Sequence, residues 1–157
     1  MQQQEHITRE QLRRHIMASG LKATHQRVVV YEALQALHGR HPSAEDVYKW
    51  LNPANPSISL GTVYKTLDSF VASGLICKVL SENDSRRYDD NCQAHNHIYC
   101  TNTQEIIDYH DPELEALLAD FFRKRNIANF NIGSIAVQIT GAKQNPEKQV
   151  TIKPNFN

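Results

Sequence analysis

The chain has 157 residues, of which 40% are hydrophobic, and its formal net charge at pH 7 is zero. This apolar content suits one ordinary core or two small ones and excludes an intrinsically disordered chain. Zero net charge argues against a protein held to nucleic acid by bulk charge alone. No stretch approaches the roughly 20 apolar residues that span a bilayer, and the polar start MQQQEHITRE is unlike a signal peptide. We therefore expect a soluble cytoplasmic protein without membrane contacts.

The two halves of the chain differ in charge. Residues 1–80 carry nine Lys or Arg against six Asp or Glu, whereas residues 81–157 carry eight against eleven. A surface that faces nucleic-acid phosphates is therefore expected in the first half.

The cysteines are three in number and widely spaced: Cys77, Cys92 and Cys100. Such an odd, scattered set predicts neither a disulfide framework nor a zinc ribbon of paired CxxC motifs. We expect reduced thiols, with Cys77 packed in a hydrophobic strand.

Four helices are expected in the first half, over about residues 8–20, 24–39, 43–52 and 59–74. Each begins with a hydroxyl side chain placed to cap the amides of its first turn: Thr8, Thr24, Ser43 and Ser59. Gly20 and Gly74 are placed to end the first and fourth helices, and Asn52-Pro53 stops the third.

The next segments, 75–80 (LICKVL) and 86–90 (RRYDD), predict a two-stranded hairpin around the turn-rich residues 81–85. Helices followed by such a hairpin are typical of a winged helix-turn-helix, in which the fourth helix would enter the DNA major groove. We assign residues 1–88 to this DNA-binding domain.

Beyond it the pattern changes to short strands and one helix. Strands are expected at 97–100, 105–110 and 132–140, and a helix at 112–126 with Pro112 at its start. The predicted fold class is α+β, with a small α/β dimerisation and metal-sensing domain over residues 89–141. The polar residues 142–157 are expected to be a flexible tail.

The fourth helix carries two sets of residues. Val63 and Leu67 are one turn apart and face the core, which leaves hydroxyls, one ring and one cation for a partner: Ser59, Thr62, Tyr64, Lys65 and Thr66. These groups suit phosphates and base edges, although a solvated helix face has the same composition.

The second half holds ligand-type residues. His95 and His97 would point to one face of a strand, and Asp108 lies within an apolar strand where an acid needs a partner. Asp89 precedes the histidines across a turn. The pattern indicates a metal site, although an exposed His pair or a strand-end salt bridge would look alike.

Three runs, GLKATHQR (20–27), HPSAEDVY (41–48) and SLGTVYKTLDSFVASGLI (59–76), resemble the signature stretches of the ferric uptake regulator family. The resemblance extends over roughly residues 10–141. It implies a homodimeric repressor that binds an A·T-rich palindromic operator in double-stranded DNA. Tyr64 and Lys65 would enter the major groove, with Lys22 in the minor groove and Arg27 near the backbone. His25 departs from the proline usual in the family.

The resemblance also adds His41 to the ligands and implies one regulatory site: His41, Asp89, His95, His97 and Asp108. Imidazoles and carboxylates without a thiolate suit Fe(II) or Mn(II), with Zn(II) as a substitute. His41 belongs to the first domain, so a bound ion would tie the two domains together. Metal binding would then act as a conformational clamp.

The sensed signal is inferred from the two carboxylates. Aspartate at 89 and 108 resembles the peroxide-sensing branch, in which iron-catalysed oxidation modifies a ligand histidine, here His41 or His95. Iron-uptake or zinc-uptake regulation is the alternative. Cys92, close to His95, could replace a carboxylate as ligand, which would favour zinc.

The family's structural zinc site is not expected. Its two CxxC pairs reduce here to Cys100 with Thr103, and to Lys143 with Pro146. The chain is not expected to be an enzyme. A non-haem iron enzyme built on two histidines and a carboxylate is the less favoured alternative, because it leaves the Tyr-Lys helix unexplained. A metal-independent winged-helix adaptor would leave the five ligand types unexplained.

Overall fold

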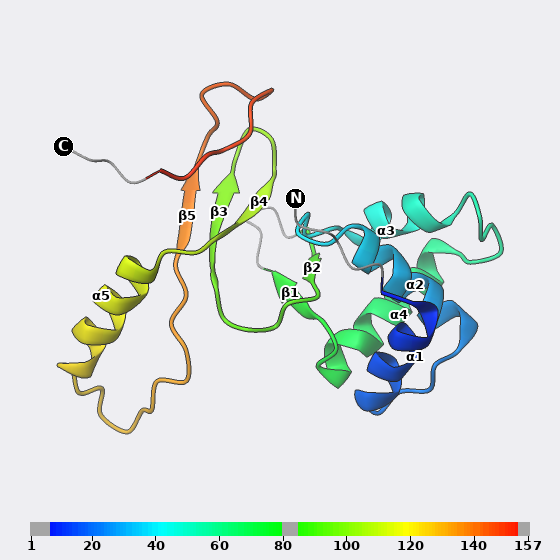
Figure 1. The fold of residues 1–157 in the computed structure, drawn as a ribbon, viewed down its shortest axis with the longest axis horizontal. Helices are drawn as coiled ribbons and strands as arrows, with labels where there is room; N and C mark the ends of the chain where they lie inside the picture. The colour runs from blue at the N-terminus through cyan, green and yellow to red at the C-terminus, as the bar shows by residue number, and fades with distance from the viewer. Residues whose placement is uncertain (1–6, 80–84, 154–157) are drawn as a thin grey trace. The chain divides into compact units, whose positions relative to one another are not determined.

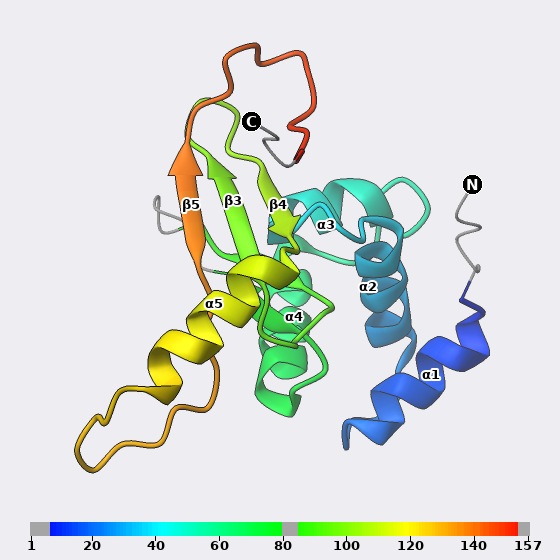
Figure 2. The same ribbon diagram turned by 60° about the vertical axis from the view of Figure 1, so that its left-hand side comes forward.

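The computed structural model describes residues 7–79 and 85–153. The chain divides into two compact units, of which the first ends at Cys92 and the second begins at Gln93. Figures 1 and 2 show helices with a hairpin in the first unit, and a small sheet with the helix α5 in the second. None of the helices in the described ranges has the length and apolar character that a membrane span requires. The predicted α+β class is confirmed.

The first unit begins with four helices: α1 (Arg9–Ala18), α2 (His25–Ala36), α3 (Ala44–Leu51) and α4 (Leu60–Ser73). All four expected caps are confirmed, because each hydroxyl accepts a hydrogen bond from a first-turn amide: Thr8, Thr24, Ser43 and Ser59. Gly74 ends α4 with a φ of 79°, a left-handed conformation that glycine adopts at little cost.

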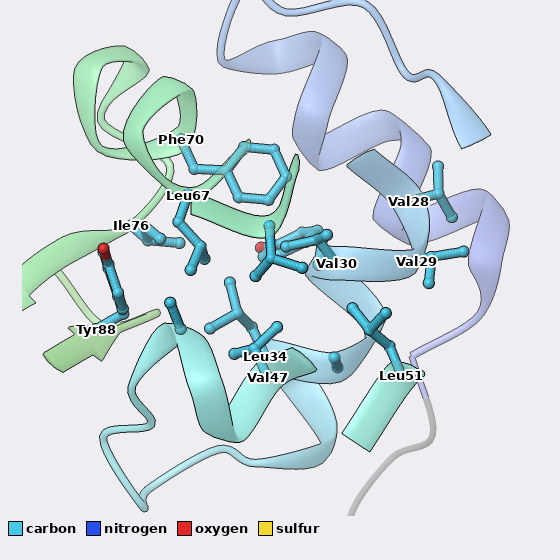
Figure 3. Packing of buried hydrophobic residues seen from close by; sticks show 14 of the residues in the cluster. Val28, Val29, Val30, Leu34, Val47, Leu51, Leu67, Phe70, Ile76 and Tyr88 are labelled. Atoms are coloured by element: carbon cyan, nitrogen blue, oxygen red, sulfur yellow. The ribbon is translucent and has the colours of Figure 1, made fainter. Parts of the chain in front are cut away.

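One apolar core holds these helices together (Figure 3). Val30 of α2, Val47 of α3 and Phe70 of α4 are completely buried in it. Burial of each such side chain contributes roughly 1.5–3 kcal/mol. Tyr88 is also fully buried in this cluster, so the hairpin shares the core of the helices.

The hairpin consists of β1 (Cys77–Val79) and β2 (Arg87–Asp89), paired antiparallel with Cys77 opposite Asp89. Residues 80–84, which include most of the expected turn, lie outside the described residues. The helices and this hairpin confirm the winged helix-turn-helix architecture.

The second unit contains β3 (Asn96–Cys100), β4 (Ile106–Tyr109), α5 (Pro112–Arg123) and β5 (Gln138–Gly141). The sheet order is β4-β3-β5, with β4 antiparallel and β5 parallel to β3. The strand expected over 132–140 begins only at Gln138. Gln138 lies opposite His97, near the start of β3, and the Val137 carbonyl accepts from the His97 amide at 3.0 Å, so residues before Val137 lie beyond the start of β3.

The start of the expected tail is anchored to the turn after β3. The Asn102 side-chain amide donates to the Lys143 carbonyl at 3.0 Å, and the Lys143 backbone amide donates to Asn102 Oδ1 at 3.0 Å. The Lys143 side chain is only 6% exposed and forms an ion pair with Glu105.

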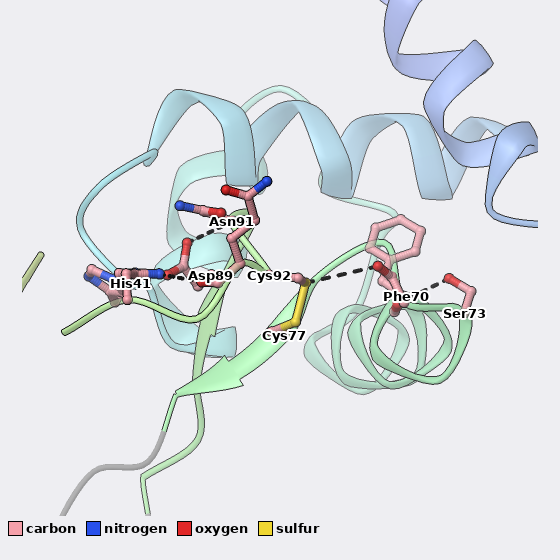
Figure 4. The surroundings of a disulfide bond; sticks show 10 residues. His41, Phe70, Ser73, Cys77, Asp89, Asn91 and Cys92 are labelled. Atoms are coloured by element: carbon pink, nitrogen blue, oxygen red, sulfur yellow. Dashed lines mark hydrogen bonds and ion pairs between the residues drawn. A yellow bond between two sulfur atoms is a disulfide. The ribbon is translucent and has the colours of Figure 1, made fainter. Parts of the chain in front are cut away.

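The prediction of three reduced thiols is wrong for two of the cysteines. Cys77 and Cys92 form a disulfide with their Cα atoms 5.4 Å apart (Figure 4), whereas Cys100 is a buried free thiol. The cause is the hairpin register, since the chain that leaves β2 after Asp89 returns past Cys77. Cys77 is therefore more than a packing residue.

Candidate metal centre and nucleic-acid interface

His41 and Asp89 form a buried pair in the first unit (Figure 4). Their side chains are 1% and 6% exposed, and His41 Nε2 lies 3.2 Å from Asp89 Oδ2. A buried carboxylate beside an imidazole nitrogen is costly unless a proton or a metal ion lies between them. The pair can therefore supply one nitrogen and one oxygen to a cation.

Strand β2 positions both members of this pair, because Asp89 belongs to the strand and the chain at His41 is hydrogen-bonded to it. Arg87 Nη1 donates to the His41 carbonyl at 3.1 Å, and the Tyr88 amide donates to the Pro42 carbonyl at 3.0 Å. His41 adopts a φ of 50°, which is unfavourable for a residue with a side chain. The surrounding hydrogen bonds thus hold the ring in a strained backbone position, a feature often found at functional sites.

The residues after β2 are also fixed to the first unit. The Asn91 amide donates to Asp89 Oδ1 at 2.9 Å, which closes a local turn around the carboxylate. Asp90 accepts from Gln35 Nε2 at 3.0 Å and lies 2.8 Å from His38 Nδ1. Sequence reasoning missed this contact between α2 and the chain after β2, because no spacing rule links residues so far apart.

A second cluster, His95, His97 and Asp108, lies in the second unit. His97 of β3 pairs directly opposite Asp108 of β4 in the sheet register. Asp108 Oδ1 lies 2.9 Å from His95 Nε2 and 3.3 Å from His97 Nε2. The two rings are also close together, with their centroids 4.4 Å apart. The sheet pairing thus directs two nitrogens and one oxygen to a common point.

The hydrogen bonding of His95 favours a cation at that point. His95 Nδ1 lies 2.6 Å from the Gln93 carbonyl, which can only accept, so Nδ1 carries the proton. In the neutral ring Nε2 then has a lone pair, and this lone pair faces a carboxylate oxygen. Two acceptors at 2.9 Å require a second proton or a metal ion. The cluster therefore has the donor chemistry of a metal half-site.

All five predicted ligands thus occur in two buried or partly buried His/Asp clusters that could bind a metal ion, His41 with Asp89 and His95 with His97 and Asp108. The donors are imidazole nitrogens and carboxylate oxygens, a set that suits Fe(II), Mn(II) and Zn(II). Cys92, the alternative ligand, is bonded to Cys77 and has no thiolate to offer in this state. The alternative in which Cys92 replaces a carboxylate as a metal ligand is therefore not supported in the disulfide state.

The predicted DNA-reading residues of α4 fall into three groups. Lys65 is exposed, and Tyr64 is partly exposed. Ser59 caps the helix, and its hydroxyl lies 3.0 Å from that of Thr62. The expectation for Thr66 is wrong, because this residue is only 7% exposed and its hydroxyl donates to the Thr62 carbonyl at 2.8 Å. Helical spacing places Thr66 one turn from Val63 and Phe70, on the buried side.

Tyr64 has a partner that the sequence did not reveal. Its hydroxyl donates to the carboxylate of Glu45 on α3. This hydrogen bond lowers the pKa of Glu45 and raises the pKa of Tyr64. Glu45 therefore fixes the direction of the Tyr64 ring on α4.

The other two predicted DNA contacts lie around the start of α2. Lys22 is exposed, and Arg27 Nη1 donates to the Lys22 carbonyl at 2.9 Å. Arg27 therefore fixes the loop that carries Lys22. His25 occupies the first position of α2 behind the Thr24 cap, so the missing proline leaves the helix start intact.

Comparison with known proteins identifies the family. The family model of the ferric uptake regulator family matches residues 18–139. The chain belongs to the ferric uptake regulator family. It is 35% identical over 108 residues to the ferric uptake regulation protein of Pseudomonas aeruginosa, covering 68% of this chain and 81% of that protein.

Two further relatives extend the likeness within the family. The peroxide-responsive repressor PerR of Staphylococcus saprophyticus is 30% identical over 125 residues, covering 78% of this chain and 80% of the repressor. The structure of the Pseudomonas aeruginosa ferric uptake regulator with manganese has a TM-score of 0.69 at 31% identity. It covers 84% of this chain and 97% of that one. The chain is thus a transcription regulator with the family's two-part fold.

Proposed function

We propose that this regulator is a metal-dependent repressor whose DNA binding requires one Fe(II) or Mn(II) ion. The ligands would be His41 and Asp89 of the first unit and His95, His97 and Asp108 of the second. The observation that carries the proposal is the convergence of His95 Nε2 and His97 Nε2 on Asp108 Oδ1, at 2.9 Å and 3.3 Å. Zn(II) would bind the same donors as a substitute.

The proposed ion controls DNA binding because its ligands come from both units. Without the ion, the α4 helices of the two chains in a dimer would sample many relative positions. Few of these positions would match both DNA half-sites at once. A cation held by both clusters would restrict that freedom. A stabilisation of about 3 kcal/mol in the DNA-competent arrangement changes occupancy by roughly a hundredfold.

The proposed partners are a second copy of the chain and an A·T-rich palindrome in cytoplasmic double-stranded DNA. The second unit supports pairing, because none of the α5 residues is buried and Leu117 and Phe121 are 68% and 48% exposed. Ser59, Thr62, Tyr64 and Lys65 on α4, with Lys22 and Arg27, would contact the DNA. A twofold dimer would present two α4 helices to matching half-sites.

The experiment that tests the metal proposal compares operator binding in Mn(II) and in chelator. Wild type should bind at least about tenfold more tightly with Mn(II). Asp108→Ala should fold but lose this gain, because it removes the oxygen shared by both histidines of the second cluster. Asp120→Ala is the matched control, since Asp120 forms ion pairs with exposed Arg123 and Lys124 at the end of α5 and should respond like wild type.

Tight operator binding by wild type in chelator would overturn the proposal. Equal loss of the Mn(II) gain in Asp108→Ala and Asp120→Ala would also overturn it, because the effect would then not come from the ligand.

The proposed signal is peroxide. Aspartate at both carboxylate positions supports it, and the likeness to PerR proteins agrees. Iron-uptake control is the second candidate, favoured by the likeness to the Pseudomonas aeruginosa protein. Bound Fe(II) would supply the reduction of peroxide, and the nearby rings of His41 and His95 would be the groups oxidised.

Mass spectrometry separates these two signals. Iron-loaded protein treated with equimolar peroxide should gain one oxygen atom on the peptide that contains His41 or His95, and it should lose operator binding. The Mn(II)-loaded protein should remain unmodified. Unmodified peptides and retained operator binding in the iron-loaded sample would favour iron-uptake control.

A further inference from the structure

The disulfide lies next to one of the proposed metal ligands. Cys77 is opposite Asp89 in the hairpin register, and Cys92 follows Asp89 by three residues (Figure 4). The bond therefore ties the chain that follows Asp89 back to the strand beside it. A covalent change here acts directly on the segment that carries a ligand.

The disulfide is also accessible from solvent. Cys92 is exposed and Cys77 is partly exposed, in contrast to Cys100, which is only 2% exposed. Thiol–disulfide exchange requires a thiolate to reach one sulfur along the S–S axis, so access controls the rate. A soluble thiol can reach Cys92 without unfolding of the core.

Whether this disulfide forms depends on the redox state of the compartment in which a DNA-binding protein works. Chromosomal DNA lies in compartments that thiol reductants keep reducing, where disulfides are usually transient and redox-sensing. Exposed disulfides are also the labile class, whereas buried ones resist reduction. The position of this bond thus suits a switch better than a permanent staple.

Hairpin pairing of Asp89 with Cys77 and several polar contacts also hold the segment from Asp89 to Cys92. Among the polar contacts are the turn between Asp89 and the Asn91 amide, and the contacts of Asp90 with Gln35 and His38. In the pair of Asp90 with His38 the Asp90 side chain is 12% exposed and the His38 side chain 57% exposed, so solvent screens this contact on the His38 side. Reduction would remove the covalent tie from this set and give the chain that leaves Asp89 more freedom beside the His41 pair.

We propose that Cys77 and Cys92 form a reversible thiol–disulfide switch that sets the metal affinity of the Asp89 and His41 pair. The disulfide state holds the pair ready for the ion, and the dithiol state binds the ion more weakly. This inference rests on the proposed metal function. It adds a second input that is separate from oxidation of a ligand histidine.

A thiol can reduce the disulfide, and a hydroperoxide can form it again. A reductant thiolate attacks Cys92 Sγ, and the S–S bond breaks to give a mixed disulfide and the Cys77 thiol. A second reductant thiol then attacks the mixed disulfide, which leaves two cysteine thiols and the reductant disulfide. In the reverse direction a hydroperoxide converts one thiolate to a sulfenic acid and is reduced to an alcohol or water. The other thiol then displaces water from the sulfenic acid and restores the S–S bond.

Thiol trapping on the native full-length chain tests the redox step without any metal. The chain is incubated with reduced glutathione, quenched, denatured and alkylated. The disulfide form should take up one alkyl group, at Cys100, and the reduced form three. We expect conversion from one to three adducts, and a return to one after hydrogen peroxide. Failure of glutathione to convert the folded chain, or of peroxide to reverse the change, would overturn the switch.

Mn(II) titration tests the coupling. Reduced wild type, freed of reductant, should bind Mn(II) about three- to tenfold more weakly than the disulfide form, because the ligand pair is less preorganised. Cys92→Ser should match the reduced wild type and ignore reductant. Cys100→Ala is the matched control and should respond to reductant as wild type does.

The outcomes distinguish the two proposals. Equal Mn(II) affinity in the disulfide and reduced forms would refute the coupling while leaving the metal proposal standing. Tighter binding after reduction would also refute it and would point to Cys92 as a ligand. Absence of Mn(II) binding in both forms would refute the metal proposal and the coupling together.

Discussion

Single side chains in this regulator carry more than one task. His95 donates from Nδ1 to the Gln93 carbonyl and presents Nε2 toward Asp108, so one hydrogen bond selects the tautomer that can bind a metal. Asp89 accepts from the Asn91 amide with one oxygen and faces His41 with the other. In both cases a hydrogen bond to the backbone fixes the direction in which the ligand side chain points.

The Tyr64 and Glu45 pair gives a prediction at this scale. The hydrogen bond lowers the pKa of Glu45 in the folded state, so its contribution to stability is present above the unfolded-state pKa and disappears as the pH falls through the folded-state value. Because Glu45 is exposed, solvent screening limits this contribution to a few tenths of a kcal/mol.

Urea unfolding at neutral and acidic pH measures the effect. Tyr64→Phe should lose those few tenths of a kcal/mol at neutral pH, and the difference from wild type should shrink near pH 3. Tyr48→Phe on α3 is the control. A difference that stays constant with pH would contradict the assigned role of the Glu45 carboxylate.

At the scale of the elements, local chemistry sets the ends of the helices. The caps and the glycine that ends α4 were predictable, because each depends on a few neighbouring residues. The length of β5 was not predictable, since it depends on where β3 begins. The disulfide was also missed, because the contact of Cys77 with Cys92 arises from strand pairing and not from cysteine spacing.

The candidate metal site also contains residues that local sequence indicates and residues whose position depends on strand pairing. Sequence pattern indicated His95, His97 and Asp108, whose residue types and strand periodicity are local features. His41 came only from the family resemblance, since nothing in its neighbourhood marks it as a ligand. Asp89 was assigned to the second domain, whereas β2 places it in the first unit beside His41. Strand pairing across the hairpin decides that position.

Gly61 within α4 and Gly74 at its end give a pair of opposite stability predictions. Gly74 has a φ of 79° and open space around its missing Cβ, so Gly74→Ala should cost about 1 kcal/mol through backbone strain alone. Gly61 lies within the helix and a Cβ there would make only an ordinary contact with Ser59, so Gly61→Ala should stabilise by about 0.5–1 kcal/mol. Thermal unfolding measures both, and changes of the same sign would contradict this account.

At the scale of the whole molecule, regulation would come from the connection between two units that each fold around their own contacts. The first unit has a large apolar core that includes Tyr88 of the wing. The second is a small sheet whose helix α5 leaves apolar side chains exposed for pairing. A cation shared by the two clusters would couple metal supply to the placement of the DNA-reading helix.

The distribution of distances between the two units tests that central claim most directly. Spectroscopic labels would be attached by thiol-independent chemistry at exposed Arg13 of α1 and exposed Glu113 of α5, in dimers with one labelled chain. The account predicts a broad distribution in chelator that narrows when Zn(II) is added to wild type and stays broad in Asp108→Ala. A distribution of the same width with and without metal in wild type would contradict it.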